Sequence, residues 1–370
     1  KLDYSEDQEQ LLDVATSFCR DKAPIAKVRK NLTDDVGYDT QIWSEITNLG
    51  WLGVALPEKF GGSDLGLAEV VSIMEPMGRA LLATPFQSTT LAAQALLSCG
   101  TPGQQEKWLP QICGGAIVSL ALSELHGDWD LENLTAQAER AGEDLRLSGT
   151  KTFVVFAKDA DALIVSVAFE GVPALVIVDK NSLPEGALIL EKNVDETQRT
   201  YRLALDGLTV PVGNLLAQDK AAAALRHIHL AANLLVAAEM CGGISGVMDY
   251  TLEYLKTRKQ FDRLIGSYQS LKHTMADILL GHEAARNHLY YAAGCFGKGD
   301  GREGEIAVRM AKAQASETLA YAADRAIQFH GGFGFTYDCD AQLYRRRAIW
   351  GASLHGDAIY HRAKLGGLLL

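Results

Sequence analysis

The spacing of apolar residues changes twice along this chain, and this change limits the folds that it can adopt. From Ser5 to about Gly115, apolar side chains recur every three or four residues, which is the spacing of amphipathic helices. From Ile117 onward, short runs such as IVSLALSE and ALVIVD are separated by Gly, Asp and Pro turns, a pattern typical of strands. From about Lys220 the helical spacing returns and continues to the end. The sequence therefore predicts helices, then strands, then helices.

A chain of 370 residues is too long for one ordinary hydrophobic core, so we expect several domains. Six or more short strands in roughly a hundred residues favour a small antiparallel barrel or sandwich. The long apolar stripe of the third part suits a helix covered by several neighbours, as in a bundle. We therefore expect an α+β fold with an N-terminal α-helical domain over residues 1–116, a middle antiparallel β-barrel or sandwich over 117–218, and a C-terminal four-helix bundle over 219–370.

The charge pattern argues against several classes of function. The net charge is −11 and no run of Lys and Arg exceeds Arg345–Arg347, so a role with nucleic acid has no electrostatic basis. The six cysteines are widely spaced and none lies at zinc-ligand spacing from a histidine, so we expect reduced cysteines and no metal. The start KLDYSEDQEQ does not read as a signal peptide, and no stretch of about eighteen apolar residues is free of charge. We expect a cytoplasmic protein without a membrane span.

Two segments near the C-terminus are more specific. Residues 254–277, YLKTRKQFDRLIGSYQSLKHTMAD, place Arg, Gln and Phe at the expected end of one helix and a further Gln at the start of the next. Residues 328–350, QFHGGFGFTYDCDAQLYRRRAIW, contain a Gln followed by a Gly-rich turn. Together with WSEITNLGWLGVALPEKFGG over residues 43–62, these segments resemble the acyl-CoA dehydrogenase family, and the resemblance runs along the whole chain in order.

The resemblance implies an α-helical domain, a β-barrel and a four-helix bundle that together hold FAD and an acyl-CoA thioester. In that family a carboxylate removes a proton α to the thioester carbonyl while the β-hydride passes to the flavin, which supplies the redox chemistry. Because such a proton is weakly acidic, the base must lie within hydrogen-bond reach and have a pKa raised by burial. An electron-transfer flavoprotein or a similar acceptor is the implied redox partner.

Family members lend residues to the ADP end of the FAD held by a neighbouring subunit, and this half of the pattern is complete here. The matching residues are Arg258, Gln260, Phe261, Gln269, Gln328, Gly331 and Gly332. An arginine can bind a pyrophosphate through two parallel hydrogen bonds, and paired glycines let backbone N–H groups approach a nucleotide. The alternative is purely structural: Arg258 would interact with a helix C-terminus, and the two glycines would end a helix.

The half of the pattern that holds a chain's own flavin departs from the family. The loop Ser123–Asp130 keeps Ser123, but Trp129 stands where a serine hydroxyl would meet the pyrophosphate. Where the family has a tryptophan beside the flavin ring and a hydroxyl that reaches N5, this chain has Phe153 followed by two valines. Asp357 replaces a threonine that helps to hold FAD, and a carboxylate there would repel a pyrophosphate. We therefore expect the own-flavin site of Ser123, Phe153 and Asp357 to be impaired.

Both usual positions of the catalytic base lack a carboxylate. Counted without a gap from the Gly-rich turn, the usual glutamate falls on His355, and the second position used by a subset of the family falls on Ala232. His355 could itself be the base, because an unperturbed imidazole has a pKa near 6.5. Glu239, two helical turns past Ala232, could also serve. A metal held by Asp357 and His361 is the least favoured alternative, since helical Asp and His pairs usually cap or face solvent.

The pattern resembles the degenerate small subunit of bacterial heterotetrameric acyl-CoA dehydrogenases that act on bulky or dicarboxylic acyl-CoAs, including steroid side-chain and pimeloyl-type substrates. It implies an α2β2 complex in which this chain lends FAD-binding residues to a catalytic partner subunit and itself lacks the usual glutamate. One alternative is a self-sufficient homotetramer with an atypical base. Another is a flavin-free structural or acyl-CoA-binding subunit.

Overall fold

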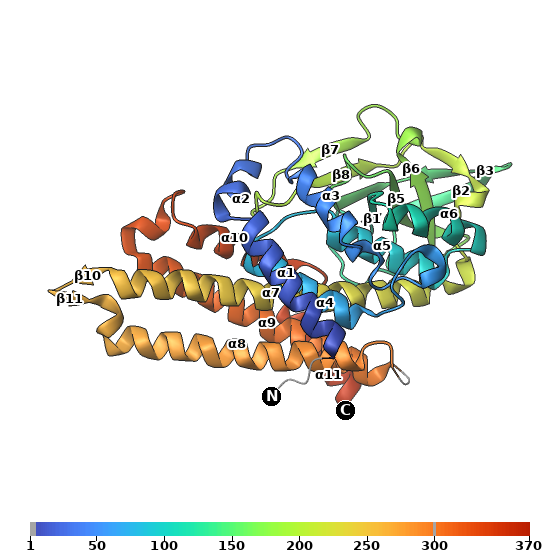
Figure 1. The fold of residues 1–370 in the computed structure, drawn as a ribbon. Helices are drawn as coiled ribbons and strands as arrows, with labels where there is room; N and C mark the ends of the chain where they lie inside the picture. The colour runs from blue at the N-terminus through green and yellow to red at the C-terminus, as the bar shows by residue number, and fades with distance from the viewer. Residues whose placement is uncertain (1–4, 299–300) are drawn as a thin grey trace.

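The fold begins with a helical part, as predicted. The computed structural model describes residues 5–298 and 301–370. The helices that precede the first strand are α1 Glu6–Lys22, α2 Ile25–Asn31, α3 Thr40–Asn48, α4 Leu67–Arg79, α5 Phe86–Cys99 and α6 Pro102–Cys113. Ser5 and Gln8 begin α1 with a capping box, in which each side chain accepts a hydrogen bond from the other residue's backbone N–H. In Figure 1 these helices run from dark blue at α1 to teal at α6, and α1 and α4 lie against the long helix α7.

Two sheets follow in the middle of the chain. Their strands are β1 Val118–Ala121, β2 Gln137–Ala141, β3 Asp144–Ser148, β4 Thr150–Val155, β5 Ala162–Phe169, β6 Val172–Asp179, β7 Leu188–Glu191, β8 Thr200–Ala204 and β9 Thr209–Pro211. The larger sheet has the order β1-β5-β2-β3-β9 with β6 paired to β5, and the smaller has the order β4-β8-β7. Most pairs are antiparallel, as expected, but β5 pairs in parallel with β1 and with β2, so the larger sheet is mixed.

The C-terminal part is a bundle of long helices. Its helices are α7 Gln218–Thr257, α8 Gln269–Cys295, α9 Arg302–His330, α10 Ala341–Ser353 and α11 Ala358–Leu369. Helix α9 packs against the other four and is the centre of this part. A hairpin of β10 Lys259–Gln260 and β11 Arg263–Leu264 joins α7 to α8 and projects beyond their ends (Figure 1). The sequence pattern does not predict this hairpin, because strands of two residues are too short to show a period.

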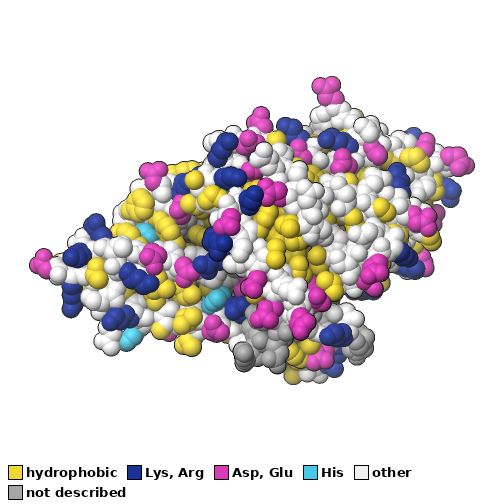
Figure 2. All heavy atoms as spheres, viewed as in Figure 1, with side chains coloured by type: hydrophobic (Ala, Val, Ile, Leu, Met, Phe, Trp, Pro, Cys, Tyr) yellow, Lys and Arg dark blue, Asp and Glu magenta, His cyan; other side chains and the backbone are white. Residues whose placement is uncertain are grey.

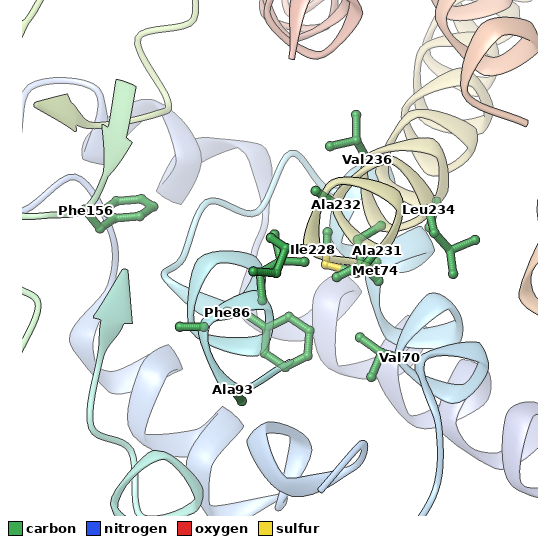
Figure 3. Packing of buried hydrophobic residues seen from close by; sticks show 14 of the residues in the cluster. Val70, Met74, Phe86, Ala93, Phe156, Ile228, Ala231, Ala232, Leu234 and Val236 are labelled. Atoms are coloured by element: carbon green, nitrogen blue, oxygen red, sulfur yellow. The ribbon is translucent and has the colours of Figure 1, made fainter. Parts of the chain in front are cut away.

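Helix α7 is the core helix of the molecule. One stretch of it, with a mean hydropathy of 1.5, is apolar enough to cross a membrane by composition, but 89% of that stretch is buried inside the protein. Figure 3 shows Ile228 and Ala231 of α7 beside Phe86 of α5 and Met74 of α4. On the outer face seen in Figure 2, acidic and basic side chains are interspersed. The apolar character of α7 is therefore explained by packing within the protein.

Helices α4 and α7 approach so closely that glycine is required where they touch. A Cβ on Gly242 would overlap the carbonyl oxygen of Glu75, and a Cβ on Gly78 would overlap that of Glu239. A backbone carbonyl cannot move away as the end of a flexible side chain can. A larger residue at either glycine would therefore push the two helices apart. This contact fixes the position of Glu239 along the α4 surface.

We expect Gly242→Ala to lower the free energy of unfolding by about 1–3 kcal/mol, because the added methyl group forces α4 away from α7. Gly294→Ala is the matched control, since Gly294 lies in α8 and a Cβ there meets no atom within 4 Å. That change should be neutral or should stabilise the chain by about 0.5–1 kcal/mol. Urea unfolding followed by circular dichroism measures both, and equal effects would contradict the importance of the close contact.

Candidate functional site

Two adjoining cavities open between the sheets and the helical parts. The first, of about 90 Å³, is mostly apolar, and Glu239 and His355 are among the residues that line it. The second, of about 440 Å³, lies beside the loop that contains Trp129. Ser123, Phe153 and His355 line both cavities. The structure therefore brings Ser123, Phe153, Glu239 and His355, which come from four separate segments, to one cleft.

Phe153, the aromatic residue predicted to stand beside a flavin ring, lies at the wall of this cleft. It sits at an irregularity of β4, its φ is 53°, and it is 48% exposed. Its N–H donates to Glu191 Oε2 at 2.9 Å, and its ring lies 6.0 Å from the ring of Trp350. A bulky residue in the left-handed region persists only where its surroundings hold it. Val155, at the position of the missing hydroxyl, lines the smaller cavity.

The loop that would meet a pyrophosphate begins at a buried ion pair. The Glu124 carboxylate lies 2.7 Å from the Nζ of Lys151, which is fully buried, and also accepts a hydrogen bond from the Thr135 N–H at 2.8 Å. Burial alone would raise the pKa of Glu124, but the hydrogen bonds from Lys151 and Thr135 lower it to about 2. Glu124 thus ties the start of the loop to its end.

The middle of the same loop is closed onto the C-terminal helices. Trp129 Nε1 donates to the carbonyl oxygen of Ser353 at 3.0 Å, and the indole lies 5.3 Å from the ring of Tyr360. The Tyr360 hydroxyl donates to Asp130 at 2.8 Å. Asp357 begins α11, because its carboxylate accepts a hydrogen bond from the Tyr360 N–H at 2.7 Å. At the two positions where the resemblance predicts hydroxyls for a pyrophosphate, the side chains are therefore engaged within the protein.

His355 lies in the turn between α10 and α11, and this turn is held from several sides. The φ of His355 is 56°, and its carbonyl oxygen accepts a hydrogen bond from Asn233 Nδ2 at 3.2 Å. Lys312, which is fully buried, donates to the carbonyl oxygen of Gly356 at 2.9 Å. Ala232, the second position considered for a base, is buried in α7. The backbone of this turn is therefore held by hydrogen bonds from α7 and α9.

Three histidines and Lys312 lie close together behind this turn. The ring of His229 lies 6.2 Å from that of His355 and 6.4 Å from that of His361. Burial, followed by the charge of Lys312, lowers the pKa of His355 to about 4 and that of His361 to about 3. Burial also lowers the pKa of His229, and that of Lys312 to about 7. His355 is therefore a weak base, because burial and then the charge of Lys312 oppose its protonation.

The free energy of unfolding should fall as the pH drops from about 6.5 towards 4. In the unfolded chain the histidines take up protons near 6.5, whereas burial holds the folded-state pKa values of His355 and His361 at about 4 and about 3. The unfolded state then binds more protons in this window, so acid favours unfolding. Urea unfolding at pH 7.5, 6 and 5 measures the slope.

His361→Gln should flatten this pH dependence, because it removes one of the buried histidines. The control is His273→Gln, since His273 lies exposed on α8. A free energy of unfolding that stays constant from pH 7.5 to 5 in the unmodified chain would contradict the assignment of neutral buried histidines.

Glu239 lines the smaller cavity, but it also belongs to a buried network of charges. Arg347 of α10 pairs with Glu239 of α7 and with Asp195 of the segment between β7 and β8, and it donates to Thr197. Burial raises the pKa of Glu239, and the charge of Arg347 limits this rise. The network joins α7, α10 and the segment that precedes β8 behind the cleft. Glu239 is thus a structural partner of Arg347 as well as a cavity residue.

The residues predicted to meet a neighbouring FAD are all exposed. Arg258, Gln260, Phe261 and Gln269 lie in and around the β10–β11 hairpin, and Gln328, Gly331 and Gly332 lie where α9 ends. The ring of Tyr254 in α7 stacks on that of His330 in α9 with 4.2 Å between centroids, which holds these two ends together. A Cβ on Gly331 or Gly332 would meet no atom within 4 Å, so the backbone is open to an approaching ligand.

Phe261 has an unfavourable conformation for its residue type. Phe261 and Asp262 form the two-residue turn of the hairpin, with φ values of 53° and 60°. A turn of this kind needs positive φ at both positions, which Asn and Gly adopt far more readily than Phe. Phe261 is also 87% exposed. An exposed aromatic side chain held in a strained backbone points to a binding role.

Several residues that shape the site do not stand in any motif of the sequence. Lys312, Arg347 and Asp195 are charged and buried, and each holds a segment of the cleft in place. The sequence offers one sign that Lys312 is buried. It lies in the segment VRMAKAQAS, among small apolar residues of a predicted core helix. Among the residues that the structure describes, no three His, Cys, Asp or Glu side chains are grouped so that they could hold a metal ion.

A chain of helices, two sheets and a helical bundle, with a cleft where the three meet, defines a protein of the acyl-CoA dehydrogenase class. Residues 5–116 match the acyl-CoA dehydrogenase N-terminal domain and residues 230–363 match the C-terminal domain. The acyl-CoA dehydrogenase FadE12 of Mycobacterium bovis is 30% identical over 312 residues, 81% of this chain and 80% of that protein. IpdE2 of Mycobacterium tuberculosis is 30% identical over 94% of this chain and 93% of that protein. The chain belongs to the acyl-CoA dehydrogenase family.

Solved structures share the fold over almost the whole chain. A variant of the Tcur3481-Tcur3483 steroid ACAD is 29% identical, has a TM-score of 0.87 and covers 98% of each chain. A chain of the ChsE4-ChsE5 complex from Mycobacterium tuberculosis is 25% identical, has a TM-score of 0.89, and covers 100% of this chain and 98% of that one. Members of the family are flavoproteins that bind FAD and oxidise acyl-CoA thioesters.

The two halves of this chain fit FAD differently. On the exposed side, Arg258, Phe261 and the open glycine backbone are free to meet a nucleotide. On the cleft side, the Trp129 indole is bonded to Ser353 and packed on Tyr360 where a pyrophosphate-binding hydroxyl is expected. The residues present therefore fit the ADP end of an FAD outside the chain better than they fit a whole FAD inside it.

Proposed function

We propose that this chain is a subunit of an FAD-dependent acyl-CoA dehydrogenase of α2β2 composition. Its role, called here the lending function, is to supply residues to an FAD that a partner subunit holds. It would supply Arg258, Gln260, Phe261, Gln328 and the Gly331–Gly332 turn to the ADP end of an FAD whose flavin ring and catalytic base belong to a partner subunit. When bound, FAD takes up the hydride from the acyl chain. The observation that carries the proposal is Phe261, which is held at positive φ and 87% exposed at the tip of a projecting hairpin.

The chemistry of this exposed face suits an adenine nucleotide. Arg258 can bind a diphosphate through a pair of charge-assisted hydrogen bonds. An aromatic side chain such as Phe261 offers a flat face on which an adenine ring can stack, a contact that does not depend on hydrogen bonding. A Cβ on Gly331 or Gly332 would meet no atom within 4 Å, so a ribose or a phosphate can come close to this part of the backbone. Cation, aromatic face and open backbone thus lie on one exposed end.

The state of the cleft favours a partner-dependent role. His355 and Ala232 occupy the two usual positions of the base, and burial gives His355 a pKa of about 4. Asp357 and Trp129 are engaged within the protein, as described above. Two of the similar solved structures are a variant of the Tcur3481-Tcur3483 steroid ACAD and the ChsE4-ChsE5 complex. A bulky acyl-CoA and a second dehydrogenase chain are accordingly the proposed substrate and partner.

The remaining parts of the proposal follow from this assignment. The domain limits 116/117 and 218/219 are supported by the end of α6 at Cys113 and the start of α7 at Gln218. An electron-transfer flavoprotein or a similar acceptor would reoxidise the partner's flavin, and the complex would work in the cytoplasm. None of these assignments depends on a residue of the cleft.

A second candidate is a self-sufficient dehydrogenase with an atypical base. It is favoured by one observation: Glu239 and His355 line the same cavity as Phe153. In this reading, the Glu239 carboxyl, whose pKa is raised by burial, would remove the proton. This chain alone would then bind FAD and be active.

The deciding experiment is the ratio of FAD to polypeptide, measured by flavin absorbance after heat release. It is measured for this chain alone and for its complex with the dehydrogenase chain that it co-purifies with. The proposal predicts almost no FAD on the chain alone and about one FAD per pair of chains in the complex. One FAD per chain in the isolated protein would sink the proposal and support the second candidate.

A further inference from the structure

Arg29, in the last turn of α2, holds the segment that follows the Gly-rich turn. Its Nε donates to Asp340 Oδ1 at 2.8 Å, and its Nη2 lies 2.6 Å from the same oxygen. Its Nη1 donates to the carbonyl oxygen of Tyr337 at 2.7 Å. One guanidinium thus reaches a side chain and a backbone group of the same segment. Arg29 is separated from them by more than three hundred residues of sequence.

The other side of the same segment is held by α7. The Asp340 N–H donates to the Tyr250 hydroxyl at 3.2 Å, and the rings of Tyr250 and His330 are stacked with 4.9 Å between centroids. His330 begins the segment and Asp340 ends it. The backbone is also tight at Gly334, where a Cβ would overlap the carbonyl oxygen of Ile327. Both ends of the segment 331–339 are therefore anchored.

Between these anchors the chain is open to solvent. Gly331, Gly332 and Tyr337 are exposed, and Phe335 is 88% exposed. An exposed segment of this length keeps one conformation only if its ends are fixed, because its own side chains bury little surface. On the C-terminal side, contacts come from Tyr250 in α7 and from Arg29 in α2. The Tyr337 side chain is also held, because its hydroxyl donates to Glu196 and its ring lies beside the guanidinium of Arg346.

We infer that Arg29 is a positioning residue for the Gly331–Tyr337 turn, so that the N-terminal helical part sets the shape in which this turn meets a nucleotide on a partner subunit. This inference rests on the proposed lending function. Arg29 itself need not touch the ligand. A guanidinium suits this task because its planar donors can hold a carboxylate and a carbonyl oxygen at once in a fixed geometry.

The test compares Arg29→Gln with the matched control Arg20→Gln. Arg20 lies on α1, is exposed, and pairs with its neighbour Asp21 at 2.8 Å. Two quantities are measured: amide hydrogen exchange over residues 331–337 in the isolated chain, and the Kd for FAD in the two-chain complex. For Arg29→Gln we expect exchange to rise about tenfold and FAD binding to weaken about tenfold, as for the loss of a charge-assisted contact. Arg20→Gln should change neither.

A charge swap separates positioning from general damage. Arg29→Asp combined with Asp340→Arg can rebuild the ion pair in reverse and should recover part of the exchange protection that Arg29→Asp alone loses. Failure of the swap to recover any protection, or unchanged exchange in Arg29→Gln, would overturn the inference.

The two proposals fail in different ways. If Arg258→Ala weakens FAD binding in the complex but Arg29→Gln speeds exchange without weakening it, the lending function stands and the positioning role is overturned. If neither variant changes the Kd for FAD, the proposed lending function is wrong, and the role of Arg29 in it is lost as well.

Discussion

Replacing Arg347 with methionine should lower the free energy of unfolding by about 3–5 kcal/mol, the usual cost of breaking a buried ion pair from one side. Arg347 is buried between the carboxylates of Asp195 and Glu239, and it also donates to Thr197. Without the guanidinium, two buried carboxylates remain in contact with no cation. They must either be hydrated by opening the structure or take up protons, and both cost free energy.

The measurement is urea unfolding at pH 7.5, with Arg362→Met as the control. Arg362 forms an ion pair with Glu317 in which both side chains are 51% exposed, so its loss should cost at most about 1 kcal/mol. The loss caused by Arg347→Met should shrink at lower pH, because burial raises the pKa of Glu239 and favours its neutral form. A loss of less than 1 kcal/mol for Arg347→Met would show that the network is hydrated in solution.

Arg258→Ala should weaken FAD binding in the two-chain complex by about ten- to a hundredfold, the range for a bidentate, charge-assisted contact. The stability of the isolated chain should change little, since Arg258 lies exposed at the end of α7. Fluorescence of the flavin released on dilution gives the Kd. Lys256→Ala is the control, because Lys256 is exposed in the last turn of the same helix and pairs with Glu253.

Phe261→Asn extends this test, because it should raise the stability of the hairpin and weaken FAD binding. Asparagine adopts positive φ more readily than phenylalanine, so the hairpin should become more stable. Loss of the aromatic face should nevertheless weaken FAD binding in the complex. If Arg258→Ala and Phe261→Asn both leave FAD binding unchanged, the hairpin does not contact the cofactor.

The order of helices, strands and helices could be predicted, because the spacing of apolar residues within each element indicates its type. The apolar residues of α7 recur at helical spacing over many turns, and the runs around β5 and β6 are separated by clear turn residues. The parallel pairing of β1 with β5 could not be predicted in the same way. About forty residues lie between these two strands, and the spacing of apolar residues within a strand does not depend on which distant strand it pairs with.

The residues of the candidate site also fall into two groups, those that a sequence motif identifies and those that only the folded structure identifies. Arg258 and Phe261, which we propose to bind the ligand, are exposed and stand in short motifs, so a resemblance can find them. Arg347 could not be found in this way, because it stands in a row of three arginines of which the other two are only partly buried. Its burial depends on Asp195 and Glu239, which are far away in the sequence. Tertiary packing therefore determines which of the three arginines is buried.

The bond from Trp129 to the carbonyl oxygen of Ser353 makes the proposed division of labour hard to reverse in evolution. A return of Trp129 to serine would lose that bond and the packing on Tyr360, while Asp357 would still repel a pyrophosphate. A return of His355 to glutamate would restore a base with no flavin beside it. Under the proposed function, each of these single substitutions would lower stability or gain no activity, so no one of them would rebuild the flavin site. Under the proposed function, the closed loop therefore keeps this chain dependent on its partner subunit.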